Sequence, residues 1–213
     1  MKNIYLALLV ICLSIISCKK DVKSSDEEVK VSDTIKTKET TAEPVLDSAA
    51  QMKAWVDYAT PGNAHKMMAD ETGTWNCEMT FWMEPNAKPE QATSTAQIRM
   101  ILGGRYQEAI YSGKMMGQPF EGKGTLAYNN ASKEYTATFI DNMGTGMMIS
   151  VGKYNESSKS IELKGDMVNP VNGKKAPYRE IYTIVDAKTR KMEVFDVKNG
   201  EEYKSMQIIM KKK

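Results

Sequence analysis

Apolar and polar residues alternate with a period of two through most of the chain after residue 73, and this periodicity constrains the fold more than any other feature. In the first such run Trp75, Cys77, Met79 and Phe81 alternate with polar residues. This is the pattern of a strand with one buried face. Gly and Asn turns separate ten runs, expected at 74–83, 92–102, 105–111, 120–128, 135–141, 147–154, 160–167, 178–185, 192–197 and 203–210.

No segment of helical period separates these runs, so consecutive strands are expected to pair antiparallel with their neighbours. About ten strands are enough to close into a barrel and to leave an interior cavity. The sequence therefore predicts an all-β fold, an antiparallel up-and-down β-barrel of about ten strands, preceded by one or two short helices.

The two helices are expected at 48–59 and 63–70. Ser48 and Gln51 have the spacing of a capping box at the start of the first helix. Four residues at helical spacing give that helix one apolar face: Met52, Trp55, Val56 and Ala59. Helices in this position are expected to pack across an open end of the barrel.

The N-terminus is typical of an export signal. Residues 1–17 carry Lys2 and then an apolar run that is too short to span a membrane. The run ends at Cys18, and Ile15-Ile16-Ser17-Cys18 resembles a bacterial lipobox, which implies cleavage before Cys18 and lipidation of its thiol. An ordinary signal peptide with an incidental cysteine is the alternative.

Residues 18–43 contain no aromatic residue and no periodicity, which is typical of a disordered tether. The barrel domain is expected to occupy 44–213. We therefore expect a lipid-anchored protein of the cell envelope, located on the periplasmic side of a membrane or on the cell surface. The anchor makes the membrane one expected partner.

Charge and cysteine content argue against nucleic-acid binding, a disulfide-stabilised fold and a catalytic thiol. The formal net charge is +2, from 29 basic and 27 acidic residues, so nucleic acid is not an expected partner. Outside the N-terminal segment the only cysteine is Cys77, which excludes an intramolecular disulfide framework. Its place among apolar neighbours predicts a buried thiol without a catalytic role. The oligomeric state stays open.

Few residues suggest reaction chemistry, and no catalytic residue, metal ligand or cofactor is assigned. His65 is the single histidine and the first candidate for a base or a ligand, although it more often makes a structural hydrogen bond. Glu108, Asp141 and Glu180 are candidates for an interior carboxylate pair. Solvated positions on the outer face are the favoured interpretation.

The 16 methionines allow two interpretations. Thioethers bind Cu(I), and Met115, Met116, Met143, Met147 and Met148 form the densest clusters. Methionine is also an adaptable lining for pockets that accept varied ligands, and this interpretation is favoured.

Several short motifs occur in a recognisable order: His65, Gly73-x-Trp75, Leu102-Gly103-Gly104-Arg105-Tyr106, Phe120-x-Gly122-x-Gly124-x-x-x-Tyr128-Asn129 and Tyr135-x-x-x-Phe139-Ile140-Asp141. Over Asp47 to Lys211 they resemble a family of uncharacterised, often secreted bacterial proteins that is grouped with the calycins. The calycins include lipocalins, fatty-acid-binding proteins and nitrobindin-like barrels. The resemblance implies a lipocalin-like barrel and supplies little chemistry.

The chain departs from this family at a few positions. Many relatives carry Gly-Tyr-Asp and a Trp where this chain has Ala127-Tyr128-Asn129 and Phe139. Nitrobindin-like barrels hold haem iron with a histidine late in the chain, and no histidine follows His65 here. Haem ligation of that kind is therefore disfavoured.

The resemblance also implies roles for individual residues. In lipocalin-like barrels the tryptophan of Gly-x-Trp plugs one end beneath an arginine, which here assigns Gly73, Trp75 and Arg105, with Arg179 as the alternative cover. The candidates for contact with an interior ligand are His65, Met79, Phe81, Met100, Leu126, Tyr128 and Phe139.

The function expected from these observations is the binding of a small apolar or amphipathic molecule inside the barrel. A solid-cored structural or interaction module is one alternative. An enzyme that uses His65 or an interior carboxylate is the other.

Overall fold

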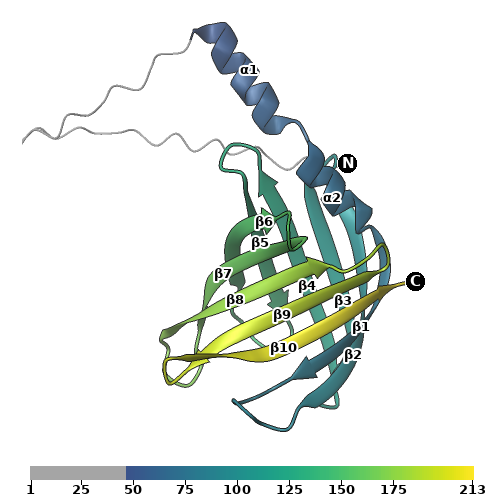
Figure 1. The fold of residues 1–213 in the computed structure, drawn as a ribbon, viewed down its shortest axis with the longest axis vertical. Helices are drawn as coiled ribbons and strands as arrows, with labels where there is room; N and C mark the ends of the chain where they lie inside the picture. The colour runs from purple at the N-terminus through teal and green to yellow at the C-terminus, as the bar shows by residue number, and fades with distance from the viewer. Residues whose placement is uncertain (1–46) are drawn as a thin grey trace, which may run out of the picture. The chain divides into compact units, whose positions relative to one another are not determined.

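The strands hydrogen-bond to one another in chain order, and the first also pairs with the last, so the sheet closes into a barrel (Figure 1). This computed structural model describes residues 47–213. The expected signal sequence, Cys18 and the tether at 18–43 lie outside that range. The strands are β1 Gly73–Phe81, β2 Glu90–Ile101, β3 Tyr106–Met115, β4 Gln118–Asn129, β5 Glu134–Asp141, β6 Met148–Asn155, β7 Ser160–Val168, β8 Lys175–Ile184, β9 Thr189–Lys198 and β10 Glu201–Lys212.

Closure depends on β1, which pairs antiparallel with both β2 and β10. Cys77 of β1 lies between Ser94 of β2 and Met210 of β10. Because β2 to β9 each pair with their two sequence neighbours, and β10 pairs with β9 and β1, the sheet has no free edge. The predicted all-β, antiparallel, closed barrel of ten strands is confirmed.

Hairpin turns fix the register of neighbouring strands. Asn199 and Gly200 have φ values of 54° and 85°, and Met116 and Gly117 have 51° and 75°. Positive φ at both central residues matches the twist of the flanking strands. The third strand, expected at 105–111, is longer than predicted, because β3 continues to Met115 before the turn at Met116 and Gly117.

Glycine at two strand positions allows close contact between backbones. A Cβ atom at Gly152 of β6 would lie 1.7 Å from the carbonyl oxygen of Glu162 in β7. One at Gly113 of β3 would lie 2.4 Å from the carbonyl oxygen of Thr93 in β2. Any larger residue at these positions would push the strands apart.

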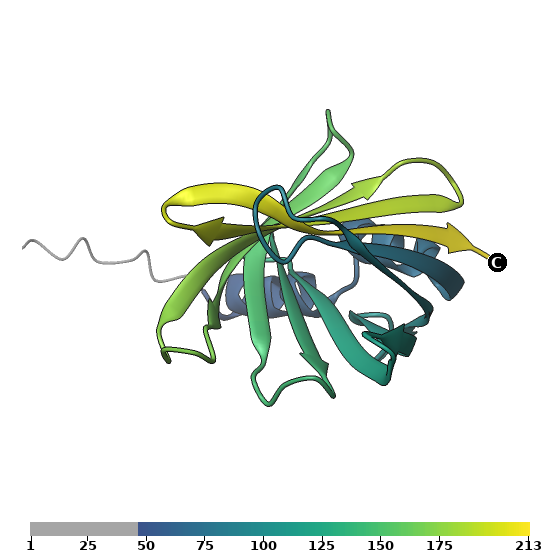
Figure 2. The same ribbon diagram turned by 90° about the horizontal axis from the view of Figure 1, so that it is seen from below.

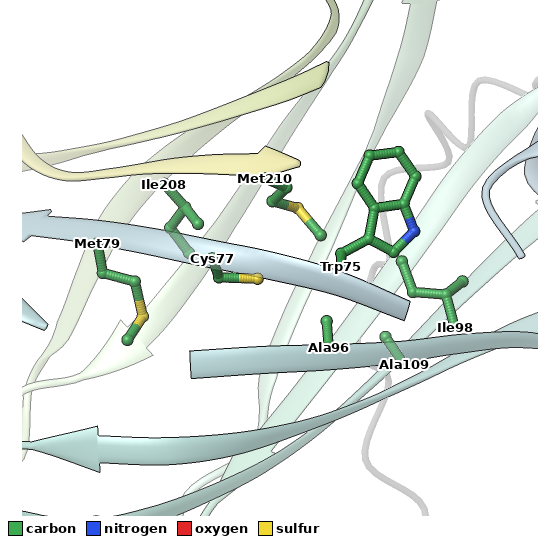
Figure 3. Close-up of a cluster of buried hydrophobic side chains, with 8 residues drawn as sticks. All are labelled: Trp75, Cys77, Met79, Ala96, Ile98, Ala109, Ile208 and Met210. Carbon is green, nitrogen blue, oxygen red and sulfur yellow. The ribbon is translucent and has the colours of Figure 1, made fainter. Parts of the chain in front are cut away.

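One apolar cluster lies where the two ends of the sheet meet (Figure 3). Trp75, Cys77 and Met79 of β1 pack there with residues of β2, β3 and β10, including Ile98 and Met210. Fully burying a large apolar side chain contributes about 1.5–3 kcal/mol. The cluster therefore stabilises the β1–β10 closure as well as the core.

Helix α2 (Asn63–Asp70) packs against one end of the barrel, and Figure 2 shows the helices behind the strands when the barrel is viewed from below. His65 and Met68 of α2 are buried. Met68 packs against Tyr135 and Leu163 in a second apolar cluster, and the Gln107 amide donates to the Met68 carbonyl oxygen at 2.8 Å. The expected position across a barrel end is confirmed for this helix.

Helix α1 (Ser48–Ala59) differs from the expectation. None of its residues is buried, and Met52 and Trp55 are 66% and 69% exposed. Its contacts with the barrel are hydrogen bonds at its C-terminal end: Asn130 Nδ2 donates to three carbonyl oxygens between residues 57 and 60, and Arg105 Nε donates to the Ala59 carbonyl oxygen at 3.0 Å. The prediction that its apolar face packs across the barrel end is wrong.

The predicted capping box of α1 is also wrong. The N-cap is Asp47, whose Oδ1 accepts a hydrogen bond from the Ala50 backbone N–H at 2.7 Å. An aspartate one position before the expected Ser48 provides the same acceptor.

Residues Val45–Lys213 form one compact unit. This unit contains the whole closed sheet and both apolar clusters, so it has a complete hydrophobic core of its own. Neither α1 nor α2 is long and apolar enough to cross a membrane.

Candidate functional site

The barrel encloses a cavity of about 350 Å³. Pockets that bind small molecules typically have volumes of about 300–1,000 Å³. Eight of the chain's 16 methionines line it, among them Met79, Met115, Met192 and Met206. Residues distant in sequence therefore meet on one adaptable apolar surface.

Four of the candidate ligand-binding residues line this cavity: Met79, Phe81, Leu126 and Phe139. The other three do not line it. Met100 and Tyr128 pack against the cluster beneath α2, and His65 lies in that helix.

His65 supports the start of α2. Its Nδ1 accepts a hydrogen bond from the Gly62 backbone N–H at 3.1 Å, and its ring meets Tyr128 edge to face at 5.8 Å. Burial and the nearby Arg105 charge lower the pKa of His65, which keeps the ring neutral and able to accept this bond. The geometry is that of a helix cap, in which the imidazole Nδ1 accepts the hydrogen bond from the Gly62 N–H.

Trp75 is completely buried at the end of the barrel near α2. Its Nε1 donates to the Glu71 carbonyl oxygen at 2.8 Å, and the guanidinium of Arg190 lies 5.1 Å from the centre of its ring. The ammonium of Lys212 lies 5.4 Å from the same ring and also donates to the Asp70 carbonyl oxygen. Trp75 thus has two cationic neighbours at the point where α2 leads into β1.

The arginine expected above Trp75 was assigned wrongly. Arg105 contacts the end of α1, and Arg179 lies over the Phe195 ring and pairs with Glu202. Arg190 has the position over Trp75 because β9 begins beside it. Gly73, the remaining residue of the expected plug, has a φ of 136°, a conformation that favours glycine.

Arg190 also forms a buried ion pair with Glu71, and the two side chains are only 5% and 6% exposed. Arg190 Nε and Nη2 approach the Glu71 carboxylate at 2.8–2.9 Å, and the Tyr182 hydroxyl donates to Glu71 Oε2 at 2.9 Å. Glu71 is the C-cap residue of α2. The ion pair therefore ties the end of α2 to β8 and β9 and forms one end of the cavity.

The three candidate carboxylates lie in different environments. Glu108 is on the outer face, where Lys123 and Arg99 bond to its carboxylate at 2.7 Å and lower its pKa. Asp141 lines the cavity near a strand end, and its Oδ1 accepts from the Met143 backbone N–H. Glu180 lines the cavity in mid-strand. The prediction that all three carboxylates face outward is confirmed for Glu108 and is wrong for Glu180.

Glu180 is enclosed by the barrel wall, and part of its surface is accessible from inside the cavity. No hydrogen bond to its carboxyl is found among residues 47–213. Burial raises the pKa of Glu180 to about 7. The site therefore places a carboxyl group without a protein donor on an apolar wall.

Sequence reasoning missed several polar groups around this carboxyl. Tyr111 and Tyr182 line the cavity near Glu180, and Gln107 lines it below α2. The alternation Tyr178-x-Glu180-x-Tyr182 contained the signal, because period two places Glu180 on the same face as two aromatic residues.

The remaining candidates for chemistry are dispersed. Cys77 is buried as expected, and burial raises its pKa to about 11, which keeps the thiol protonated. Met115 and Met148 line the cavity, whereas Met116 and Met143 are exposed. Between residues 47 and 213, no three His, Cys, Asp or Glu side chains gather in an arrangement that could hold a metal ion.

Comparison with known proteins identifies the family. Residues 60–212 match the family described as protein of unknown function (DUF1579). The chain belongs to the DUF1579 family. The comparison of this DUF1579 member with curated proteins gave no significant match.

Solved structures share the fold of this DUF1579 barrel. Rv2717c from M. tuberculosis superposes with a TM-score of 0.54 at 14% identity, over 72% of this chain and 99% of that one. The S-type phycobiliprotein lyase CPES from Guillardia theta superposes with a TM-score of 0.51 at 8% identity, over 75% and 96%. At these identities the likeness shows the fold alone.

Removing the buried cation at the barrel end is expected to destabilise the protein. Arg190→Met leaves the Glu71 carboxylate buried and unpaired, which should lower the free energy of unfolding by about 3–5 kcal/mol. The double variant Glu71→Gln/Arg190→Met should lose less, because no charge is then unpaired. Urea denaturation measures both.

Lys53→Met is the matched control, because Lys53 pairs with Asp57 on the exposed surface of α1. Its cost should stay below about 1 kcal/mol. Equal losses for Arg190→Met and Lys53→Met would contradict a structural role for the buried pair.

Glu180 should make stability depend on pH. The folded protein keeps the Glu180 proton up to about pH 7, whereas the unfolded chain loses it near the ordinary pKa of 4.5. Stability should therefore fall as pH rises between these values, by at most about 3 kcal/mol. Glu180→Gln should be more stable than the wild type at pH 8 and similar at pH 4 in thermal or urea denaturation.

Glu108→Gln is the control for Glu180→Gln. The Glu108 carboxylate is paired on the outer face, so removing its charge should give no gain in stability at pH 8. A Glu180→Gln variant that also gains nothing at pH 8 would show that its carboxyl is well solvated.

Proposed function

We propose that this DUF1579 barrel binds a small, largely apolar molecule in its interior, and that a lipid on Cys18 holds it at a membrane of the cell envelope. The observation that carries the first part is the cavity of about 350 Å³ lined by methionine and aromatic side chains. The second part rests on the sequence of the N-terminal segment.

The cavity favours ligand binding over a solid-cored structural module. Empty space in a protein core lowers stability roughly in proportion to its volume. Larger side chains at small inward positions such as Ala109, Gly124 and Ala137 would fill much of this space. A barrel with only a structural role would gain stability from such residues, whereas a binding protein needs the space.

The wall chemistry supports an amphipathic ligand. Methionine side chains adapt to ligands of different shape, and the aromatic residues Phe81, Phe120 and Phe139 supply broad apolar surfaces. A few polar groups, such as Gln107 and Glu180, interrupt these surfaces. Pockets of this composition hold an apolar body and orient it through a few polar contacts.

Filling part of the cavity should weaken binding. Ala137 lines the cavity on β5, and Ala137→Phe adds a phenyl ring to it. The affinity for the neutral apolar dye Nile red should fall at least about tenfold, because the ring occupies the space that the dye needs. Fluorescence titration of the chain from residue 19, which retains the whole compact unit, measures the change.

Ala127→Phe is the matched control. On β4 the side chain of Leu126 lines the cavity, so the next residue, Ala127, faces outward. A phenyl ring on this outer face should leave dye binding unchanged. Circular dichroism of both variants verifies folding. Absence of Nile red binding by the wild type, or equal binding by Ala137→Phe, would refute the proposed function.

Lipidation is tested on the full chain in a bacterial host. The wild type should partition into the detergent phase and carry a diacylated N-terminal cysteine by mass spectrometry, because multiple acyl chains hold a protein firmly on a bilayer. Cys18→Ser should lose both properties, and Cys12→Ser should keep them. Unchanged partitioning of Cys18→Ser would exclude this anchor.

A further inference from the structure

We propose that the cavity selects cationic amphiphiles, which are molecules with an apolar body and a protonated amine, and that Glu180 binds the amine. This inference rests on the proposed function, because it names the class of ligand for the same cavity. It is carried by the charges of the cavity wall and by the environment of Glu180.

The charged groups that line the cavity are all acidic. They are Glu71, Asp141 and Glu180, and no lysine, arginine or histidine of the described residues lines it. Arg190 neutralises Glu71 within the buried ion pair. The remaining charge disfavours ligands with a carboxylate or phosphate head, since like charges brought together in a desolvated site repel strongly.

Among the three carboxyls that line the cavity, Glu180 has the strongest need for a partner. On the neighbouring strands it lies opposite Leu163 and Val194, neither of which has a polar side chain. The hydroxyl of Tyr182, two residues along the same face, already donates to Glu71. Within residues 47–213 the Glu180 carboxyl therefore has no hydrogen-bond donor, although it faces open space.

An enclosed carboxyl without a donor costs stability. A ligand that carries an ammonium group supplies up to three donors and the opposite charge at once. Such charge-assisted hydrogen bonds are roughly twice as strong as neutral ones, which favours an amine over an alcohol. Burial holds the Glu180 pKa at about 7, so the carboxyl ionises readily near neutral pH when a cation enters.

Aromatic rings near Glu180 suit the same ligand. Tyr111 lies close enough to interact electrostatically with Glu180, and Tyr178 and Tyr182 flank it on β8. The faces of aromatic rings attract cations, most strongly where water is excluded. An ammonium group at Glu180 would therefore be surrounded by favourable groups, while its apolar body would contact methionine side chains deeper in the cavity.

The experiment compares octylamine, 1-octanol and octanoate by isothermal titration calorimetry at pH 7.5, with the chain from residue 19. The three share one alkyl chain and differ in the charge of the head. Octylamine should bind at least about tenfold more tightly than octanoate, with 1-octanol between them. Glu180→Gln should weaken octylamine binding about tenfold and leave 1-octanol and Nile red unchanged.

Asp196→Asn is the matched control. Asp196 is a second carboxyl with a pKa raised by burial and with a buried oxygen that has no hydrogen-bond partner, but it does not line the cavity. Its amide variant should bind octylamine like the wild type. If Glu180→Gln proves unfolded by circular dichroism, Glu180→Ala replaces it.

The outcomes separate the two proposals. If Nile red and 1-octanol bind but octanoate binds as tightly as octylamine, or Glu180→Gln keeps its octylamine affinity, the preference for cations is refuted and the binding function stands. If neither Nile red nor any of the three ligands binds the wild type, the proposed function fails and this inference fails with it.

Discussion

The buried ion pair between Glu71 and Arg190 is the interaction on which the α2 end of the barrel depends. It joins the last turn of α2 to the start of β9, and the Tyr182 hydroxyl adds β8 to the same group. Trp75, at the start of β1, packs against the arginine and bonds to the backbone of Glu71. The contacts join the adjacent elements α2 and β1 to β8 and β9, which are more than 100 residues away in sequence, so the pair holds this end of the barrel together.

A ten-stranded barrel encloses more space than small inward side chains fill, and this excess creates the cavity. The strands differ in what they contribute to it. β1 and β10 provide a dense apolar seam, whereas β8 presents Tyr178, Glu180 and Tyr182 to the open interior. Met79, Ile208 and Met210 belong both to the seam and to the cavity wall, so the residues that close the sheet also shape the cavity. Apolar burial stabilises the seam, and β8 adds the Glu180 carboxyl to the cavity wall.

Much of the fold was predictable, because strands and turns depend on local sequence. The alternation around Trp75 and Cys77 and the Asn199-Gly200 turn led to the correct strand order and closure. The errors concern residues whose positions depend on distant partners. Arg190 is 119 residues from Glu71 in sequence, and no local pattern links them. The apolar periodicity of α1 predicted a buried face, but the barrel contacts only the end of that helix.

By itself the sequence determined a closed antiparallel barrel with a tryptophan at its start, because period-two burial and turn residues act over a few neighbours. It also placed Glu180 between two tyrosines on one face of a strand. Only the tertiary structure decided that this face looks into an unfilled cavity, that Lys123 and Arg99 pair with Glu108, and that Arg190 covers Trp75. These outcomes depend on which side chains meet once the barrel closes, and such contacts join residues far apart in sequence that no local pattern links.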